Sequence, residues 1–412
     1  MTTSTPRGPL ARPAPTATTG RPGLMLATAT IGFAVTFWAW ALLSPLGATL
    51  REQLHLSAFQ QSLVVAVPVI VGSLGRIPVG ALTDRWGARR MFPTVALLTV
   101  LPVLYLGHLA NSLTDYLIGG FFLGLGGTTF AIGIPFVNSW YPPARRGLAL
   151  GIFGAGMGGT AISAFTTVQL SNTLGPSFPF DIVAAVLVVY AVVAHLLLRD
   201  RPNRQTVPGG ILARLATTLR MPVTLQLSFL YAVAFGGFVA FSVYLPTYLV
   251  SAFHLDRSDA ALRTAGFVVL AVVMRPIGGW LSDRIGPITV LVTSYTAVAL
   301  LAVVAAIGVP LIPLGTAAFL GMAAALGAGT GAVFALVARL VPAGQIGAVT
   351  GVVGAAGGLG GFFPPLVMGA VYETTGSYAI GFLLLAATAA TAALFTATAM
   401  RNRTRRNTTA DR

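Results

Sequence analysis

The segment RIPVGALTDRWG (residues 76–87) recurs later in the chain as RPIGGWLSDRIG (residues 275–286). The two segments share arginine, glycine, leucine, aspartate, arginine and glycine at equivalent positions, each 199 residues apart. A second pair of segments, YPPARRGLALGIFGAGMGG (141–159) and VPAGQIGAVTGVVGAAGGLGG (341–361), matches at a separation of 200 residues. Two independent blocks at nearly one separation indicate that the chain is a parallel duplication of one unit.

The composition is typical of a membrane protein. Of the 412 residues, 55% are hydrophobic and 8% are charged, whereas soluble domains carry about 25% charged residues. Crossing about 30 Å of hydrocarbon takes a helix of about 20 apolar residues. We therefore predict an all-α membrane protein with twelve transmembrane helices in two pseudo-symmetric six-helix bundles. The predicted spans are 24–48, 62–84, 91–110, 115–140, 146–170, 178–198, 222–250, 260–282, 287–308, 312–340, 346–370 and 377–399.

All 25 basic residues are arginines, and most of them lie in short segments between the apolar runs. A nucleic-acid-binding domain would gather them on one polar fold with aromatic platforms, so no nucleic-acid partner is expected. The positive-inside rule explains the pattern better and predicts that both termini are cytoplasmic, in a multi-pass protein of the inner (plasma) membrane. The chain has no cysteine, which excludes disulfides, thiol catalysis and thiolate metal sites.

The longest polar stretch between spans falls in the middle of the chain and divides it into six spans plus six. Duplicated membrane carriers bind their substrate between the two halves near the midplane of the bilayer. The predicted organisation is a disordered cytoplasmic N-terminus at 1–22, a six-helix bundle at 23–198, a cytoplasmic linker at 199–220, a second six-helix bundle at 221–400 and a cytoplasmic tail at 401–412.

Two arginines lie inside apolar runs. Arg76 and Arg275 each precede an aspartate, Asp84 or Asp283, by eight residues, which is about 12 Å along a helix at about 1.5 Å per residue. If the aspartates mark the membrane boundary, both guanidinium groups lie near the midplane. A cation there costs at least about 2.5–3.5 kcal/mol, so each arginine needs an anion.

The ten acidic residues lie at span ends, in loops or at the termini, so none is predicted to pair with Arg76 or Arg275 in the middle of the membrane. A structural salt bridge with a buried carboxylate is the alternative, and we favour a substrate anion. Two fork-shaped guanidinium groups match the paired oxygens of a small planar oxyanion. The residues themselves thus lead to a small monoanion or oxyanion as substrate.

The loop sequence GALTDRWGARR after the second span, repeated as GWLSDRIG after the eighth, resembles the loop motif of the major facilitator superfamily, and the resemblance extends over all twelve spans. The segments FAIGIPFVNSWYPPARRGLALGIFGAGMGG (130–159) and GVVGAAGGLGGFFPP (351–365) further resemble the signatures of the nitrate/nitrite porter family. The resemblance implies the major facilitator fold and a carrier of nitrate and nitrite. No enzyme activity, cofactor or metal is expected.

The resemblance also implies which residues bind the anion. It places Arg76 and Arg275 on the anion itself. Tyr231, Phe235 and Phe130 would form aromatic walls that exclude water and strengthen the arginine–anion contacts. Packing between helices is the alternative role for these rings.

Glycine-rich faces in the fifth and eleventh spans contribute Gly154 and Gly358 to the candidate substrate-binding residues. Such small-residue faces allow helices to approach closely, and they also present a smooth surface for movement. The chain departs from the porter pattern at Met157, which stands where the family usually has an asparagine that helps to hold the anion. We include Met157 among the binding residues.

The charged loop pairs are candidates for gating. Asp84 and Arg85, with Asp283 and Arg284 in the repeat, follow the second and eighth spans. The resemblance implies that these residues form interdomain contacts that favour one state of the carrier. Anchoring by the positive-inside rule is the alternative.

The coupling mode follows from what can titrate inside the membrane. Proton-driven carriers commonly need a carboxylate or histidine at depth, but the four histidines lie in loops or near span ends. An arginine pair stays positive unless an anion neutralises it, which favours nitrate/nitrite antiport. Proton-coupled nitrate symport and a proton-coupled drug or organic-anion exporter are the alternatives. Nothing in the sequence supports a membrane-embedded enzyme or sensor, and we expect a monomer in the lipid bilayer.

Overall fold

The computed structural model of the chain describes residues 21–201, 216–341 and 346–403. Within these ranges every element is helical, and twelve segments are long and apolar enough to cross a membrane. The predicted class and the number of spans are therefore confirmed. The predicted disordered N-terminus and cytoplasmic tail lie almost wholly outside the described residues, and so does the middle of the predicted linker.

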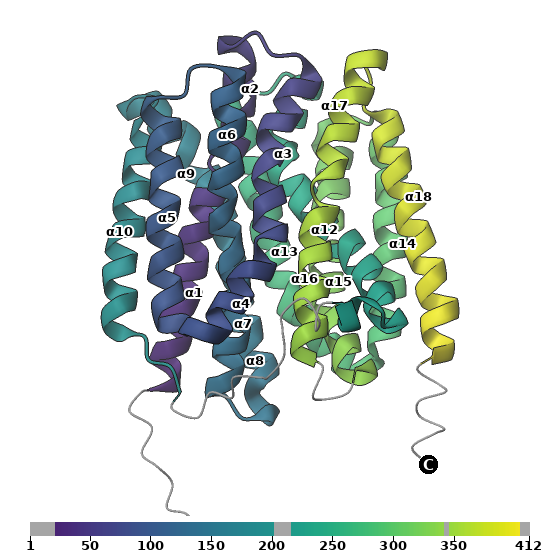
Figure 1. Cartoon of the computed structure of the whole chain (residues 1–412). Helices are drawn as coiled ribbons and strands as arrows, with labels where there is room; N and C mark the ends of the chain where they lie inside the picture. The colour runs from purple at the N-terminus through teal and green to yellow at the C-terminus, as the bar shows by residue number, and fades with distance from the viewer. Residues whose placement is uncertain (1–20, 202–215, 342–345, 404–412) are drawn as a thin grey trace, which may run out of the picture.

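The first half of the chain forms the first six spans (Figure 1). Its elements are α1 (Pro22–Trp40), α2 (Leu43–Gln53), α3 (Ala58–Leu74), α4 (Arg76–Trp86), α5 (Ala88–His108), α6 (Leu113–Leu123), η1 (Gly124–Thr128), α7 (Thr129–Trp140), α8 (Pro143–Gly154), η2 (Ala155–Gly158), α9 (Gly159–Leu174) and α10 (Phe178–Leu197).

The second half repeats this order. Its elements are α12 (Pro222–Phe253), α13 (Arg257–Ile285), α14 (Pro287–Ala306), η3 (Leu311–Gly315), α15 (Thr316–Leu340), α16 (Ile346–Gly360), α17 (Phe363–Thr375), α18 (Ala379–Phe395) and η5 (Thr396–Met400).

Several spans consist of two or three consecutive helices that meet at glycines. Gly75 separates α3 from α4, and a Cβ atom on Gly75 would lie only 2.5 Å from the carbonyl oxygen of Val71. The glycines of η1 turn the fourth span into a short 3₁₀ segment before α7 begins. Breaks of this kind interrupt the regular hydrogen bonds of the helix and leave backbone carbonyls free to accept bonds from side chains.

The helix ends differ from the predicted span ends by a few residues. The second span was predicted to start at residue 62, but α3 already begins at Ala58 because Ser57 caps it. The Ser57 hydroxyl accepts from the backbone N–H of Gln60 at 3.2 Å, and the Gln60 side chain accepts from the N–H of Ser57 at 2.9 Å. Hydropathy locates the apolar centre of a span, whereas a polar capping box of this kind sets where the helix starts.

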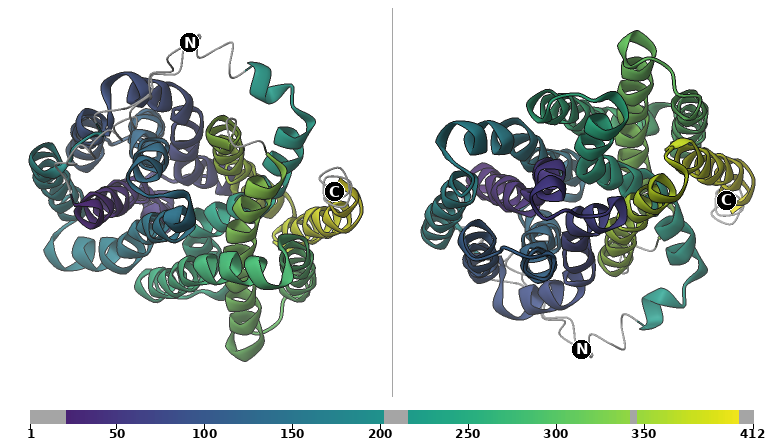
Figure 2. Two further views of the ribbon diagram at one scale, coloured as in Figure 1. Left: turned by 90° about the horizontal axis from the view of Figure 1, so that it is seen from below. Right: turned by 90° about the horizontal axis from the view of Figure 1, so that it is seen from above.

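The two halves lie side by side (Figures 1 and 2). They meet along α9 and α13, along α3 with α16 and α17, and between α2 and α12. The first two seams are equivalent in the repeat. One joins the fifth span to the eighth, and the other joins the eleventh span to the second. The internal duplication thus extends from the sequence to the packing of the bundles.

The end of the molecule that carries α2 and the end of α17, at the top of Figure 1, is called the distal end here. Hydrogen bonds cross between the halves at this end. The Ser44 hydroxyl donates to the carbonyl of Ser242 at 2.9 Å, and the Glu373 carboxylate accepts from the Ser57 hydroxyl and the Phe59 N–H, both at 2.9 Å. Further bonds across the same end join Gln61 to Thr247 and Arg257 to Glu52. The distal end is therefore closed in this structure.

We expect Glu373→Gln to loosen the distal end, because a neutral amide accepts more weakly than a carboxylate from Ser57 and Phe59. The chain contains no cysteine, so a single reporter can be introduced as Ser62→Cys at a fully buried position of this end. Thiol labelling of the reporter should become severalfold faster in the Glu373→Gln background. Labelling at the exposed control Thr173→Cys should not change. An unchanged rate at residue 62 would show that the carboxylate does not hold this end closed.

Candidate functional site

Arg76 is buried at the break in the second span. It is the first residue of α4, directly after Gly75, and only 7% of its surface is exposed. Its Nε atom donates to the carbonyl of Gly127 in η1 at 3.4 Å, and its Nη1 atom donates to the carbonyl of Gly354 in α16 at 2.6 Å. The second of these bonds joins the N-terminal half to the C-terminal half at the centre of the molecule.

Arg275 occupies the equivalent position within α13 and is 9% exposed. Its Nη2 atom donates to the hydroxyl of Tyr231 at 3.2 Å, and its Nη1 atom contacts the Sδ atom of Met157. Met157 belongs to η2, the glycine-rich break in the fifth span, so this contact also joins the two halves.

Each arginine thus reaches the glycine-rich helix of the opposite half. Arg76 bonds to Gly354, and a Cβ atom on Gly154 would lie 3.6 Å from the Cζ atom of Arg275. The two glycines are equivalent in the repeat, and so are the two arginines. The centre of the molecule therefore follows the internal duplication, and the absence of side chains on both glycines makes room for the guanidinium groups.

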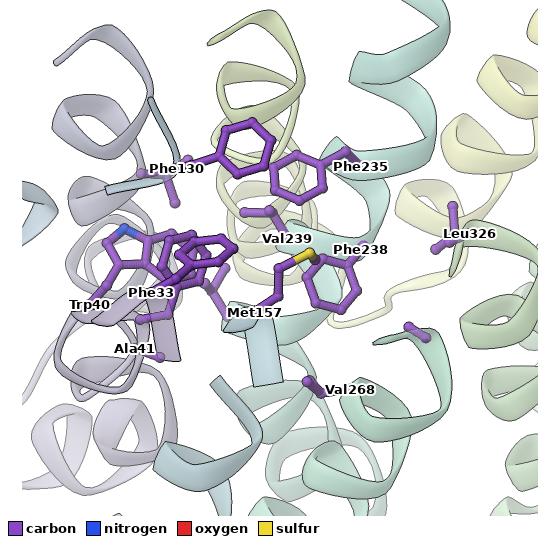
Figure 3. Packing of buried hydrophobic residues seen from close by; sticks show 14 of the residues in the cluster. Phe33, Trp40, Ala41, Phe130, Met157, Phe235, Phe238, Val239, Val268 and Leu326 are labelled. Atoms are coloured by element: carbon purple, nitrogen blue, oxygen red, sulfur yellow. The ribbon is translucent and has the colours of Figure 1, made fainter. Parts of the chain in front are cut away.

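Aromatic rings surround the two guanidinium groups. The Cζ atoms of Arg76 and Arg275 lie 5.8 and 6.0 Å from the ring centre of Phe235, so both groups lie against one ring. Tyr231 stacks on Phe235 with ring centres 5.0 Å apart and an interplanar angle of 3°. Phe130 belongs to the N-terminal half, as Arg76 does, and its ring centre lies 5.0 Å from the Cζ atom of Arg76. Figure 3 shows Phe130 beside Phe235, which comes from the other half. Cation–π contacts of this kind offset part of the cost of burying the charges.

Phe334 of α15 is a further aromatic neighbour that the sequence did not indicate. Its ring centre lies 5.8 Å from the Cζ atom of Arg275 and 4.8 Å from the ring centre of Tyr231, to which it is T-shaped. It lies in an ordinary apolar run of the tenth span. No motif or spacing in that run distinguishes it from a residue that packs in the core.

The arginines have neutral partners throughout. In the described part of the chain, their hydrogen-bond acceptors are backbone carbonyls, a tyrosine hydroxyl and a thioether. Ion pairs of the distal end, such as Arg257 with Glu52 and Arg263 with Asp259, lie away from the centre. Two positive charges are thus buried together beside dipoles and rings that solvate them only in part.

Gly358 has a different setting from Gly154. A Cβ atom on Gly358 would lie 2.1 Å from the Oγ atom of Ser73 in α3, so this glycine allows α16 and α3 to pack against each other. Its equivalent in the repeat, Gly158, has no heavy atom within 4 Å of such a Cβ position. Met157, in contrast, extends into the centre of the molecule (Figure 3).

The predicted gating residues lie at the end of the molecule opposite to the distal end. Asp84 and Arg85 belong to the last turn of α4, Asp283 and Arg284 to the last turn of α13, and all four are exposed. The guanidinium of Arg284 lies 4.2 Å from the ring centre of Trp280. The repeat therefore places equivalent charges at equivalent helix ends.

Comparisons with known proteins agree on one superfamily. The sequence profile of the Major Facilitator Superfamily matches residues 29–262 and 227–411. The structure is similar to that of a bacterial homologue of the human lysosomal transporter Spinster in an inward-facing and unoccupied conformation. That similarity has a TM-score of 0.69, with 18% identity, over 93% of this chain and 97% of the other. At this identity the likeness shows the fold alone.

Three relatives share a higher sequence identity with the chain than this structure does. The "Probable nitrate/nitrite transporter NarK2" of Mycobacterium tuberculosis (strain H37Rv) is 51% identical over 88% of this chain and 93% of its own length. The "Nitrite extrusion protein" of Bacillus subtilis (strain 168) is 39% identical over 89% of this chain and 91% of its own length. The "Probable nitrate transporter NarT" of Staphylococcus epidermidis is 33% identical over 87% of this chain and 91% of its own length.

The two equivalent glycines offer a matched pair of substitutions. Gly358→Ala places a methyl group against Ser73, and overpacking of this kind costs about 1–3 kcal/mol. Gly158→Ala adds the same methyl group where no atom is close. We expect Gly358→Ala to lower the thermal unfolding temperature of the purified protein, and Gly158→Ala to leave it nearly unchanged. Equal unfolding temperatures would contradict the close approach of α16 and α3.

Proposed function

The chain belongs to the Major Facilitator Superfamily, and we propose that it carries nitrate and nitrite across the membrane, with the anion held between Arg76 and Arg275. The observation that supports this most is the position of the two guanidinium groups. They come from opposite halves, lie against the same ring, that of Phe235, and have only neutral partners among the described residues. A buried charge of this kind is a functional site by default.

A small oxyanion fits this environment chemically. Nitrate and nitrite are planar monoanions, and a guanidinium group binds two oxygens of such an anion through parallel hydrogen bonds. Phe130, Phe235 and Tyr231 would cover the faces of the anion and keep water out, which strengthens each charge contact. Among small oxyanions, the names of the sequence relatives support nitrate and nitrite as the substrates.

Anion binding would change the contacts between the halves. In this structure Arg76 donates to the carbonyl of Gly354 and Arg275 contacts Met157, so the guanidinium groups contact the opposite half directly. An anion competes for the same donors and removes the repulsion between the two charges. The halves can then rock about the centre, so that the distal end opens as the other end closes.

The positions of the charged residues support an assignment of the gate and of the orientation of the chain in the membrane. We assign Asp84, Arg85, Asp283 and Arg284 to contacts that form and break at the end opposite to the distal end. The arginines near this end support cytoplasmic termini in the inner membrane. The carrier works as a monomer in this scheme, because one chain supplies both halves of the site.

Exchange of anions is the coupling mode that the site favours. Among the described residues that contact the two guanidinium groups, none is a carboxylate or a histidine that could carry a proton through the centre. Returning the empty carrier would move two uncompensated charges through the closed state. We therefore propose nitrate/nitrite antiport, with proton-coupled nitrate symport as the alternative.

Replacing Arg76 by lysine tests the role of the guanidinium group. We expect Arg76→Lys to lower nitrate uptake into proteoliposomes by about tenfold or more, because losing one charge-assisted hydrogen bond costs about 1.5–3 kcal/mol. Arg263→Lys, at the ion pair with Asp259 within α13, is the matched control and should keep most of the flux. Near-normal flux in a correctly inserted Arg76→Lys protein would contradict direct anion binding.

The coupling mode is tested by the contents of the vesicles. Proteoliposomes loaded with nitrite should take up labelled nitrate, and vesicles without an internal anion should take up very little. A pH gradient across the membrane should have no effect on the exchange. Uptake into anion-free vesicles that responds to the pH gradient would instead establish proton symport.

A further inference from the structure

A second, chemically different cavity lies in the outer wall of the C-terminal half. It is a crevice of about 450 Å³ between α12, α17 and α18. Phe241 and Tyr248 of α12, Met368 of α17, and Phe382 and Leu385 of α18 line it. These helices are membrane-spanning segments, and α18 forms the outer edge of the bundle (Figures 1 and 2). The crevice is therefore separate from the arginine pair, from which α12 itself divides it.

The crevice opens sideways, toward the lipid. Phe363, Val367 and Leu384 line it and are 61%, 37% and 49% exposed, so they form its rim on the outer surface of the bundle. The break in the eleventh span, between Gly360 and Phe363, lies along the same wall. Gly360 at the end of α16 and Phe363 at the start of α17 both line the crevice.

Aromatic and polar contacts close the crevice at both ends. At the distal end, the rings of Tyr248 and Tyr378 lie 4.9 Å apart. At the opposite end, the rings of Phe229 and Phe395 lie 5.8 Å apart, and Arg403 donates to the side chain of Gln226 at 2.6 Å. The lining positions on α12 extend from Phe229 to Tyr248, which is about 28 Å along a helix at about 1.5 Å per residue. It can admit a long, thin molecule that lies parallel to the helix.

The lining has no polar group that requires a ligand. The Thr388 hydroxyl already donates to the carbonyl of Leu384 at 2.8 Å. None of the lining residues is among the described residues with a buried side-chain N or O atom that lacks a partner. An anion or a water cluster would gain nothing here, and an apolar cavity left empty loses dispersion contacts on every wall.

We propose that this crevice binds one acyl chain of a membrane phospholipid. The chain fills the gap beside the broken eleventh span and packs on the aromatic face of α12. The inference depends on the membrane position of the helices and not on the identity of the transported anion.

The first experiment counts bound lipids. Native mass spectrometry of the protein, purified in a mild detergent from membranes of phosphatidylethanolamine and phosphatidylglycerol, should detect one phospholipid that resists detergent exchange. Ala240→Phe adds a ring at a lining position and should remove this lipid. Val192→Phe adds the same ring on the exposed outer face of α10 and should not. If Ala240→Phe does not fold, Leu384→Trp at the rim replaces it.

The second experiment locates the lipid. Phosphatidylcholine with a diazirine in its acyl chain should label the partly buried Phe241 and Leu385 after detergent exchange, while label at Leu101 on the exposed face of α5 disappears. Equal loss of label at both places, or an unchanged lipid count in the Ala240→Phe protein, would overturn the proposal. Absence of crevice label together with a dimeric mass would assign the crevice to a second copy of the chain instead.

Discussion

Two guanidinium groups buried on one phenylalanine ring are the constraint on which the centre of this protein depends. Arg76 and Arg275 are both buried, and their hydrogen-bond partners among the described residues carry no charge. The surrounding structure must therefore solvate two cations with dipoles and rings. Gly127 and Gly354 supply carbonyl oxygens and Tyr231 supplies a hydroxyl, so the two charges are solvated only in part.

A helix break is the means by which an apolar span provides one of these dipoles, whereas the carbonyl of Gly354 comes from within α16. A regular helix uses its carbonyls internally, whereas the 3₁₀ turn of η1 presents the carbonyl of Gly127 to Arg76. The break at η2 brings Met157 to Arg275 in the same way. Glycine serves twice at such places, since it tolerates the tight turn and leaves room for the neighbouring side chain.

The sequence predicted the spans, the duplication and the two central arginines, because hydropathy and internal repetition depend on local residues. It did not identify Phe334, which looks like any other apolar residue of the tenth span, or the carbonyls of Gly127 and Gly354 as arginine partners. These contacts join residues far apart in the chain and depend on where the helices bend. Gly154 and Gly358 looked alike in sequence, yet one borders Arg275 and the other packs on Ser73.

The crossed contacts at the centre bear on the origin of the fold. Each half contains one arginine and one glycine-rich helix, but the arginine of either half reaches the glycine of the other. A single six-helix unit could not have completed such a site alone. Two parallel copies of an ancestral unit could have done so as a homodimer, and fusion of the two genes would then have allowed the two surfaces to diverge. The position equivalent to Met157 in the second half is Gly357. A homodimer of identical chains could not have had two different residues at these positions.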